Sequence, residues 1–259
     1  MQRMRIYFVI ASALTLASLS RPNSCLAEKP RELQKLLCVG NSYTRGIKPG
    51  VDAFMMAHQK EIQLKYITPG GRQLSQHLKH AGTTNEIRTG KWDVVMLQEQ
   101  SQAPALPVLR DSFLESGKQL CKIVRDSGAQ PILFTTWGRR DGDKANRSHN
   151  PDFETMQKRL TEAYQELGAA AKAAVIPIGP AWAALKERDE KLWRKLYAKD
   201  GSHPSAYGAY LSGAVLYASL TGNNPRQVHV VLNGVTVEEA FVLCEVAAQV
   251  ALPEKRGLH

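Results

Sequence analysis

Five short apolar runs are spaced along the chain and separated by longer segments of mixed character. They are rich in β-branched residues, nearly continuously apolar, and cover residues 35–40, 62–68, 92–98, 130–137 and 174–180. A continuous apolar run of this length is typical of a strand that is buried on both faces, as in a parallel sheet. The pattern therefore predicts five buried strands in a mostly parallel sheet.

The segments between these runs carry the three- and four-residue spacing of amphipathic helices. The clearest covers residues 151–174, where Leu160 and Leu167 lie on one face and Asp152 provides a start signal. Weaker patterns cover residues 51–60, 73–80, 108–127, 205–220 and 236–251. The alternation predicts an α/β protein, a three-layer α/β/α sandwich around a mostly parallel five-stranded sheet. We find no repeat, linker or low-complexity segment, so we expect one domain.

The N-terminal segment follows a different pattern. Arg3 and Arg5 precede an apolar run over residues 6–19, and a polar stretch with small residues leads to Ala27. This order is typical of a secretory signal peptide, and the run is too short for a permanent membrane span. We expect a signal peptide over residues 1–27, a single domain over 28–259, and a secreted or periplasmic protein. Lipid anchoring at Cys25 is the alternative, although the usual aliphatic residue three places earlier is missing.

Charge and cysteine content narrow the possible partners. The formal net charge of +10 becomes +7 once the three arginines of the predicted signal peptide are subtracted. This balance favours anionic partners, but the basic residues are scattered and no aromatic-interleaved basic motif indicates nucleic-acid binding. Cys38, Cys121 and Cys244 remain after cleavage and lack metal-site spacing. The sequence therefore predicts no disulfide scaffold, no metal site and no cofactor, and it leaves a single bridge open.

Polar and glycine residues follow the predicted strands at their carboxyl ends. Ser42 comes after the first strand, Gly70 and Gly71 after the second, and Gln98 ends the third. In a parallel sheet these ends share one edge, where ligands bind. Trp137, at the end of the fourth strand, either stacks on a sugar at this edge or is buried. Ser42 itself fits a helix cap, a phosphate-binding residue or a nucleophile.

A second polar pair lies near the C-terminus, in the stretch DGSHPSAYG. Asp200 and His203 are three residues apart in a loop that precedes a predicted helix. A carboxylate at this spacing can fix the tautomer of the imidazole and leave its other nitrogen free as a base. A phosphate-binding role for Ser42 would leave this pair without a function. The residues therefore favour a Ser42, His203 and Asp200 arrangement for nucleophilic catalysis.

Together these motifs resemble the SGNH, or GDSL-like, hydrolase superfamily. VGNSYT is similar to its first block, with Asn41 where many members carry aspartate, and DGSHPSAYGAYLSG is similar to its last block. The resemblance spans residues 35–221 and implies a flavodoxin-like fold and a serine hydrolase. Its implied catalytic residues are Ser42, Asp200 and His203.

The middle blocks of the family supply the oxyanion hole and depart more from its pattern. TPGGRQLSQHL is similar to the second block, which implies that the N–H groups of Ser42 and Gly71 are donors. The third block usually reads G-x-N-D, but here it is LQEQSQAP. A glutamine offers the same donor chemistry on a longer arm, so Gln98 is the expected side-chain donor and Gln100 the alternative.

The glutamine also favours a carbohydrate-esterase-like branch of the superfamily. We expect an enzyme that hydrolyses a short-chain ester, such as an acetyl ester, on a small molecule or polysaccharide. The alternative is a secreted glycan-binding protein with the same fold and no turnover. Arg139 and Arg140 either bind an anionic substrate or belong to the charged surface, and four histidines lack an evident partner. These are His58, His77, His80 and His149.

Overall fold

The computed structural model describes residues 33–252. Within them, five parallel strands form a single sheet with the order β2-β1-β3-β4-β5. The strands are β1 (Lys35–Val39), β2 (Gln63–Ile67), β3 (Val94–Leu97), β4 (Gln130–Phe134) and β5 (Ala174–Ile176). This order is that of a flavodoxin-like sheet, whose strand order reverses between β1 and β3. The predicted α/β class and parallel five-stranded sheet are confirmed.

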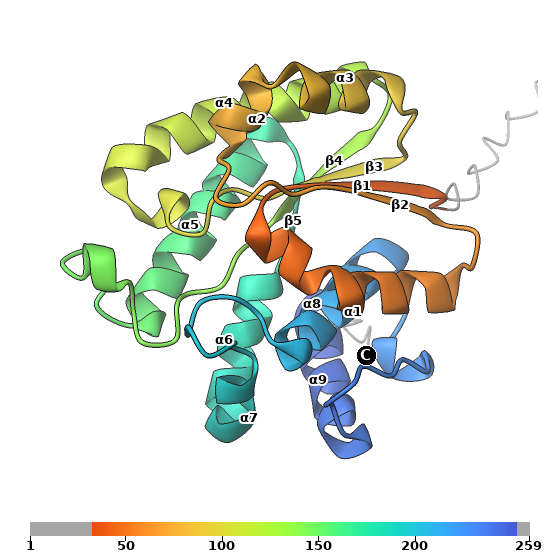
Figure 1. Ribbon diagram of the computed structural model, residues 1–259, viewed down its shortest axis with the longest axis vertical. Coiled ribbons are helices and arrows are strands. Elements are labelled where there is room, and N and C mark those ends of the chain that lie inside the picture. Colours follow the sequence, from red (N-terminus) through yellow and green to blue (C-terminus); the bar gives the residue numbers. More distant parts are fainter. Residues whose placement is uncertain (1–32, 253–259) are drawn as a thin grey trace, which may run out of the picture. The chain divides into compact units, whose positions relative to one another are not determined.

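Helices cover both faces of this sheet (Figure 1). One layer contains α2 (Leu74–Lys79), α3 (Ala81–Thr89), α4 (Pro107–Asp126) and α5 (Phe153–Ala171). The other contains α1 (Ser42–His58), α6 (Ile178–Arg188), α7 (Glu190–Lys195), α8 (Ala206–Thr221) and α9 (Val237–Ala251). Short 3₁₀ turns lie at Ala103–Ala105, Lys144–Asn146 and Pro225–Gln227.

Alternate residues of each strand enter two separate cores. In β1, Leu36 and Cys38 pack with the α1 layer, whereas Leu37 and Val39 pack with the α4 layer. All four side chains are fully buried. Because a strand points successive side chains to opposite faces, a continuous apolar run is required where both faces are covered. This burial is why the strand positions could be predicted from the sequence.

Helix α1 begins at Ser42, well before the expected start at residue 51. Gly46, Pro49 and Gly50 read as turn residues in the sequence, yet they lie inside the helix. A Cβ on Gly50 would lie 1.8 Å from the main-chain oxygen of Ala209, at the start of α8. The glycines therefore allow α1 to pack closely on α8, and the helix predicted to begin at residue 51 begins at Ser42.

The ends of β4 and β5 also differ from the sequence prediction. The runs 130–137 and 174–180 yield shorter strands, because α6 begins at Ile178 and the chain leaves the sheet after Phe134. Helices α3, α6 and α7 were not predicted. Gly179 sits against Thr136, where a Cβ would lie 2.1 Å from the Thr136 carbonyl oxygen. Apolar residues thus continue past both strands because the loops that follow them are packed inside the molecule.

Neither a disulfide nor a membrane-spanning helix occurs within residues 33–252. Cys38, Cys121 and Cys244 are buried and free, so no disulfide bridges them. None of the helices between residues 33 and 252 is long and apolar enough to cross a membrane. The predicted signal peptide over residues 1–27 and its Cys25 lie outside the described part of the chain.

Candidate active site

The first part of the site is the turn between β1 and α1. The Asn41 side chain caps α1 by accepting a hydrogen bond from the Tyr43 N–H at 3.1 Å. Its amide nitrogen donates to the carbonyl of Arg72 at 3.1 Å, which ties the turn to the loop after β2. Ser42 thus occupies the first turn of the helix, where N–H groups have no intrahelical acceptor. Both its hydroxyl and its N–H are available for chemistry.

Ser42, His203 and Asp200 form one continuous chain of hydrogen bonds. The Ser42 Oγ lies 2.9 Å from His203 Nε2, and His203 Nδ1 lies 2.6 Å from Asp200 Oδ2. Burial alone would raise the pKa of Asp200, but hydrogen bonds from the imidazole and from the N–H groups of Ser202 and His203 lower it. The ionised carboxylate can only accept, so Nδ1 carries the proton and Nε2 of the neutral imidazole faces the serine hydroxyl.

The loop that carries Asp200 and His203 is held from both ends. The Ala198 N–H donates to the His203 carbonyl at 2.8 Å, and the Ser205 N–H donates to the Leu196 carbonyl at 2.8 Å. Ser205 also caps α8, as the sequence predicts. The side chains of Asp200 and His203 remain 50% and 44% exposed. The pair is therefore fixed in position yet open to solvent.

Two aromatic side chains contact the same loop through hydrogen bonds with Ser202. Trp137 Nε1 donates to the Ser202 carbonyl at 2.9 Å, and the Tyr43 hydroxyl lies 2.7 Å from Ser202 Oγ. Tyr43 and Trp137 are stacked with ring centroids 4.7 Å apart, and Trp182 stacks on the other side of Trp137 at 4.0 Å. Trp137 is fully buried. Of the two roles left open for Trp137, the structure gives the buried one, with a hydrogen bond that positions the loop.

Gly71 lies in the turn after β2, beside the nucleophile turn. Its φ angle is +67°, in the region that favours glycine, and the space around its Cα is open. The neighbouring Arg72 carbonyl accepts the hydrogen bond from Asn41 described above. No acceptor is found for the Gly71 N–H within residues 33–252. The turn therefore presents an unused donor next to Ser42.

Gln98, the expected side-chain donor, contacts the start of α1. It is fully buried, and its Oε1 accepts from the Asn41 N–H at 3.0 Å and the Thr44 hydroxyl at 2.7 Å. Its amide nitrogen donates to the Glu99 carbonyl. Gln98 thus holds the first turn of α1, a role that the sequence did not indicate.

Gln100, the alternative, is partly exposed. Its Oε1 accepts from the N–H groups of Gln102 and Ala103 at 2.8 Å and 3.1 Å, and its Nε2 donates one hydrogen bond to Gln102 at 3.0 Å. An amide nitrogen carries two hydrogens. One donor of Gln100 is therefore uncommitted.

Two buried titratable groups that the sequence did not single out stabilise the surroundings of Ser42. His77 Nε2 lies 2.9 Å from the Gly40 carbonyl, and burial lowers the pKa of His77 to about 4. Glu99 accepts hydrogen bonds from the N–H groups of Leu74 and Gln100, and burial raises its pKa to about 7. No sequence signal marks either residue, because their partners are main-chain groups of distant segments.

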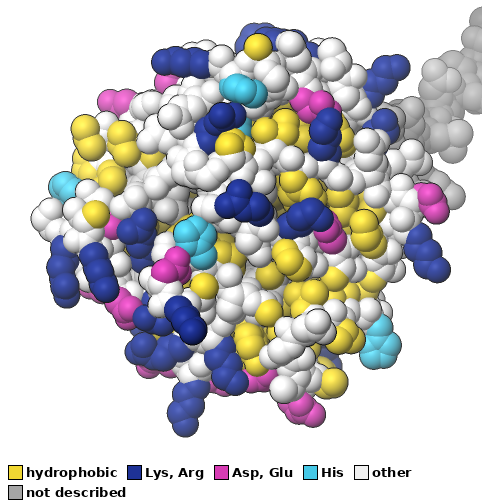
Figure 2. Space-filling model, viewed as in Figure 1, with side chains coloured by type: hydrophobic (Ala, Val, Ile, Leu, Met, Phe, Trp, Pro, Cys, Tyr) yellow, Lys and Arg dark blue, Asp and Glu magenta, His cyan; other side chains and the backbone are white. Residues whose placement is uncertain are grey.

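Positive and negative side chains are interspersed on the face of the molecule that Figure 2 shows. Figure 2 shows Lys and Arg side chains spread among Asp and Glu, in agreement with the scattered basic residues of the sequence. No group of three or more potential metal ligands occurs among the described residues. A hollow of about 600 Å³ lies between α5 and α6, lined by residues such as Gln157 and Pro180, and does not include Ser42.

Comparison with known proteins identifies the superfamily to which the fold corresponds. No family model matches the sequence, and no curated protein matches it. Among solved structures, a protein from Slackia heliotrinireducens named as an SGNH hydrolase matches with a TM-score of 0.61 at 27% identity. The match covers 73% of this chain and 99% of the other. The chain belongs to the SGNH hydrolase superfamily.

Two further solved structures share the fold of this chain. A DUF4886 family protein from Bacteroides uniformis matches with a TM-score of 0.69 at 16% identity, over 83% of this chain and 93% of its own. An acetyl xylan esterase matches with a TM-score of 0.58 at 14% identity, over 72% and 99%. At these identities the likeness concerns the fold. The resemblance inferred from the two sequence motifs is thereby confirmed at the level of the superfamily.

Proposed function

We propose that this SGNH hydrolase is a serine esterase in which Ser42 is the nucleophile. The observation that carries the proposal is the hydrogen-bonded chain from Ser42 through His203 to Asp200, at 2.9 Å and 2.6 Å. A serine hydroxyl is a poor nucleophile until a base takes its proton, and an oriented neutral imidazole is such a base. The arrangement thus supplies each group that acyl transfer requires.

The reaction proceeds in two stages through an acyl-enzyme. Ser42 Oγ attacks the ester carbonyl while its proton passes to His203 Nε2, and the charge of Asp200 stabilises the imidazolium. The same proton then passes to the leaving alcohol as the C–O bond breaks. Water attacks the acyl group in the second stage, again with His203 as the base, which releases the acid and restores the serine.

The oxyanion hole is formed by the N–H groups of Ser42 and Gly71. The Asn41–Arg72 hydrogen bond joins the turns that carry the two residues, and neither N–H has an acceptor among residues 33–252. The contacts support Gln100 as the side-chain donor, because one of its amide hydrogens is free. Gln98, in contrast, uses its oxygen to hold Asn41 and Thr44 in place. Removing one oxyanion donor typically costs about 10²–10³-fold in turnover.

The substrate is a short-chain ester of a polar alcohol, such as an acetylated carbohydrate. Support comes from the rim of the site, where partly exposed side chains are polar, including Gln100, Gln102 and Arg139. The half-exposed Asp200 and His203 leave the nucleophile accessible to a polymer. The acetyl xylan esterase among the structural neighbours has a compatible activity. We further propose that residues 1–27 direct the enzyme to a secreted or periplasmic location.

The function is tested with a substitution that leaves the fold intact. Ser42→Ala is expected to abolish hydrolysis of 4-nitrophenyl acetate and labelling by a fluorophosphonate, because a helix-end hydroxyl contributes little to stability. Ser148→Ala, at an exposed serine, is the matched control and should keep both. Labelling at another serine would refute Ser42 as the nucleophile. Retention of acetylated xylan without any turnover would support the glycan-binding alternative instead.

A further inference from the structure

Arg139 is held beside the proposed active site by a buried carboxylate. Its Nη1 donates to Asp143 Oδ1 at 2.9 Å, and Asp143 is fully buried. Gln102 Nε2 and Asn146 Nδ2 also donate to Asp143 at 2.7 Å and 2.8 Å, as does the Ala145 N–H at 3.2 Å. Burial alone would raise the pKa of Asp143, but these donors lower it. The ionised carboxylate therefore fixes the orientation of the Arg139 side chain.

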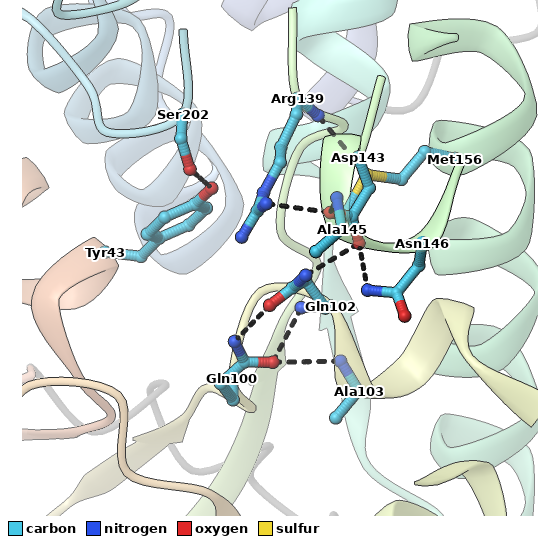
Figure 3. Close-up of polar contacts among 10 residues, drawn as sticks. All are labelled: Tyr43, Gln100, Gln102, Ala103, Arg139, Asp143, Ala145, Asn146, Met156 and Ser202. Atoms are coloured by element: carbon cyan, nitrogen blue, oxygen red, sulfur yellow. Dashed lines mark hydrogen bonds and ion pairs between the residues drawn. The ribbon is translucent and has the colours of Figure 1, made fainter. Parts of the chain in front are cut away.

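The opposite edge of the guanidinium is only partly satisfied. Arg139 Nε is buried and has no hydrogen-bond acceptor within residues 33–252, and the guanidinium also interacts with the Tyr43 hydroxyl. In Figure 3 the terminal nitrogen that is not bonded to Asp143 points towards the space bounded by Tyr43, Gln100 and Gln102. An unsatisfied buried donor is costly, and more so on a charged group. This edge is therefore suited to an acceptor that the chain itself does not supply.

This space adjoins the proposed nucleophile and its base. Tyr43 directly follows Ser42, and its ring meets the His203 ring edge-on at a centroid distance of 5.3 Å. The Arg140 N–H donates to the Gly201 carbonyl at 2.9 Å, which joins the Arg139 loop to the His203 loop. Burial raises the pKa of Tyr43, and nearby Arg139 is among the groups that oppose this effect. An acceptor bound by Arg139 would thus belong to the molecule that reacts at Ser42.

We propose that Arg139 binds a carboxylate of the ester substrate, so that the preferred substrates are acyl esters of carboxylate-bearing alcohols such as acidic sugars. This inference rests on the proposed esterase function. Nη2 is the nitrogen left for this carboxylate, because Nη1 donates to Asp143 and Nε is buried. The planar guanidinium fixes the direction of its N–H groups, which the flexible ammonium of lysine does not. Gln102 Nε2 donates one hydrogen bond, to Asp143, and its second hydrogen is suited to a hydroxyl of the same ligand. Arg140 is not a second such group, because it pairs with Asp141 at 2.8 Å on the surface.

The test compares charged and neutral esters of the same acyl group. The 2-, 3- and 4-acetoxybenzoates place a carboxylate at three distances from the ester, and their methyl esters are the neutral partners. The readout is the ratio of kcat/KM for each acid to that for its methyl ester, in which effects common to both cancel. We expect Arg139→Gln to lower this ratio about 10- to 100-fold for at least one isomer, the range for a lost charge-assisted hydrogen bond.

Two further variants distinguish binding of the substrate carboxylate from an effect of overall charge and from a failure to fold. Arg147→Gln removes one positive charge from an exposed position of the same loop and should leave the ratio unchanged. Arg139→Lys keeps a cation beside Asp143 and should give an intermediate ratio, even if Arg139→Gln fails to fold. An equal ratio in wild type, Arg139→Gln and Arg139→Lys would overturn the proposal. So would a similar loss in Arg147→Gln.

A binding measurement keeps this inference distinct from the esterase proposal. If the wild type hydrolyses neither ester, the proposed function fails, and titration with glucuronate and glucose then decides the role of Arg139. Tighter binding of glucuronate than of glucose, with the preference lost in Arg139→Lys or Arg139→Gln, would support the carboxylate site. Equal binding of the two sugars would overturn it.

Discussion

Replacement of Gln98 by alanine should cost stability more than it costs catalysis. Its Oε1 accepts from the Asn41 N–H and the Thr44 hydroxyl, whose residues are 2% and 0% exposed. A buried donor without an acceptor costs about 1–3 kcal/mol, so two such donors lower the free energy of unfolding by about 2–6 kcal/mol. We expect kcat of the folded variant to fall less than the 10²–10³-fold typical of a lost oxyanion donor.

Urea denaturation at 25 °C measures the loss in the free energy of unfolding. A double-mutant cycle gives the part of this loss that comes from the hydrogen bond between Gln98 and Thr44. Thr44→Val removes the hydroxyl at nearly constant shape, so in the double variant with Gln98→Ala only Asn41 is left unsatisfied. The cycle should give a coupling free energy of about 1–2 kcal/mol. If Gln98→Ala were as stable as the wild type but had a kcat about 10²–10³-fold lower, this reasoning would be refuted. Gln98 would then be the oxyanion donor.

The neighbouring glutamine provides the contrasting variant. Gln100→Glu keeps an oxygen to accept from the N–H groups of Gln102 and Ala103 but removes the amide donor. If Gln100 contributes to the oxyanion hole, this substitution lowers kcat by about 10²-fold or more with little change in melting temperature. Normal turnover in both Gln98→Ala and Gln100→Glu would leave the hole with its main-chain donors alone.

Three further outcomes follow from the geometry. Gly71→Ala should lower kcat while leaving KM nearly unchanged. A side chain at φ +67° costs about 1–2 kcal/mol, and relief of this strain turns the N–H away from the oxyanion. An unchanged kcat would exclude the Gly71 N–H as a donor. Tyr43→Phe keeps the ring stack but loses the hydroxyl contact with Ser202, so kcat should drop severalfold, with Ser202→Ala non-additive in the double variant. Glu99→Gln tests a pH effect: the folded pKa of about 7 lies above the ordinary 4.5, so the folded state holds this proton more tightly than the unfolded chain. Wild-type stability relative to Glu99→Gln should therefore fall between about pH 4.5 and 7 and level off above it, as followed by urea denaturation at each pH.

The sequence was most informative where local chemistry alone determines the structure. Strands buried on both faces must be continuously apolar, so the runs of β1, β3 and β4 marked the sheet. The prediction that all five strands are buried was wrong for the edge strands β2 and β5, which are only partly buried. Asp200 and His203 are close enough in the chain for one loop to bring them together, and their contact with Ser42 follows from the shared edge of a parallel sheet. The hydrogen bond of 2.9 Å between Ser42 and His203 agrees with that expectation.

The sequence was least informative where a residue depends on partners far along the chain. Gly46 and Gly50 read as turn residues, but they serve the close contacts of α1 with the His203 loop and α8. Gln98 looked like a donor because its position matched a family motif, and only the folded chain shows which acceptors and donors surround it. Likewise, nothing in the sequence relates His77 to the Gly40 carbonyl. Propensity describes single segments, whereas these roles arise from tertiary packing.

One set of residues positions the Ser42 turn and another positions the His203 loop, and Tyr43 connects the two. Gln98 and His77 fix the turn before Ser42, while Trp137 fixes the loop of His203 through Ser202. Tyr43 belongs to α1 and also contacts Ser202, so it sets the distance between nucleophile and base more directly than either set. For each kcal/mol of stability lost, Tyr43→Phe should therefore reduce kcat more than Gln98→Ala does. Equal reductions would mean that the two loops are positioned by the sheet edge itself and that the connecting hydroxyl has no separate role.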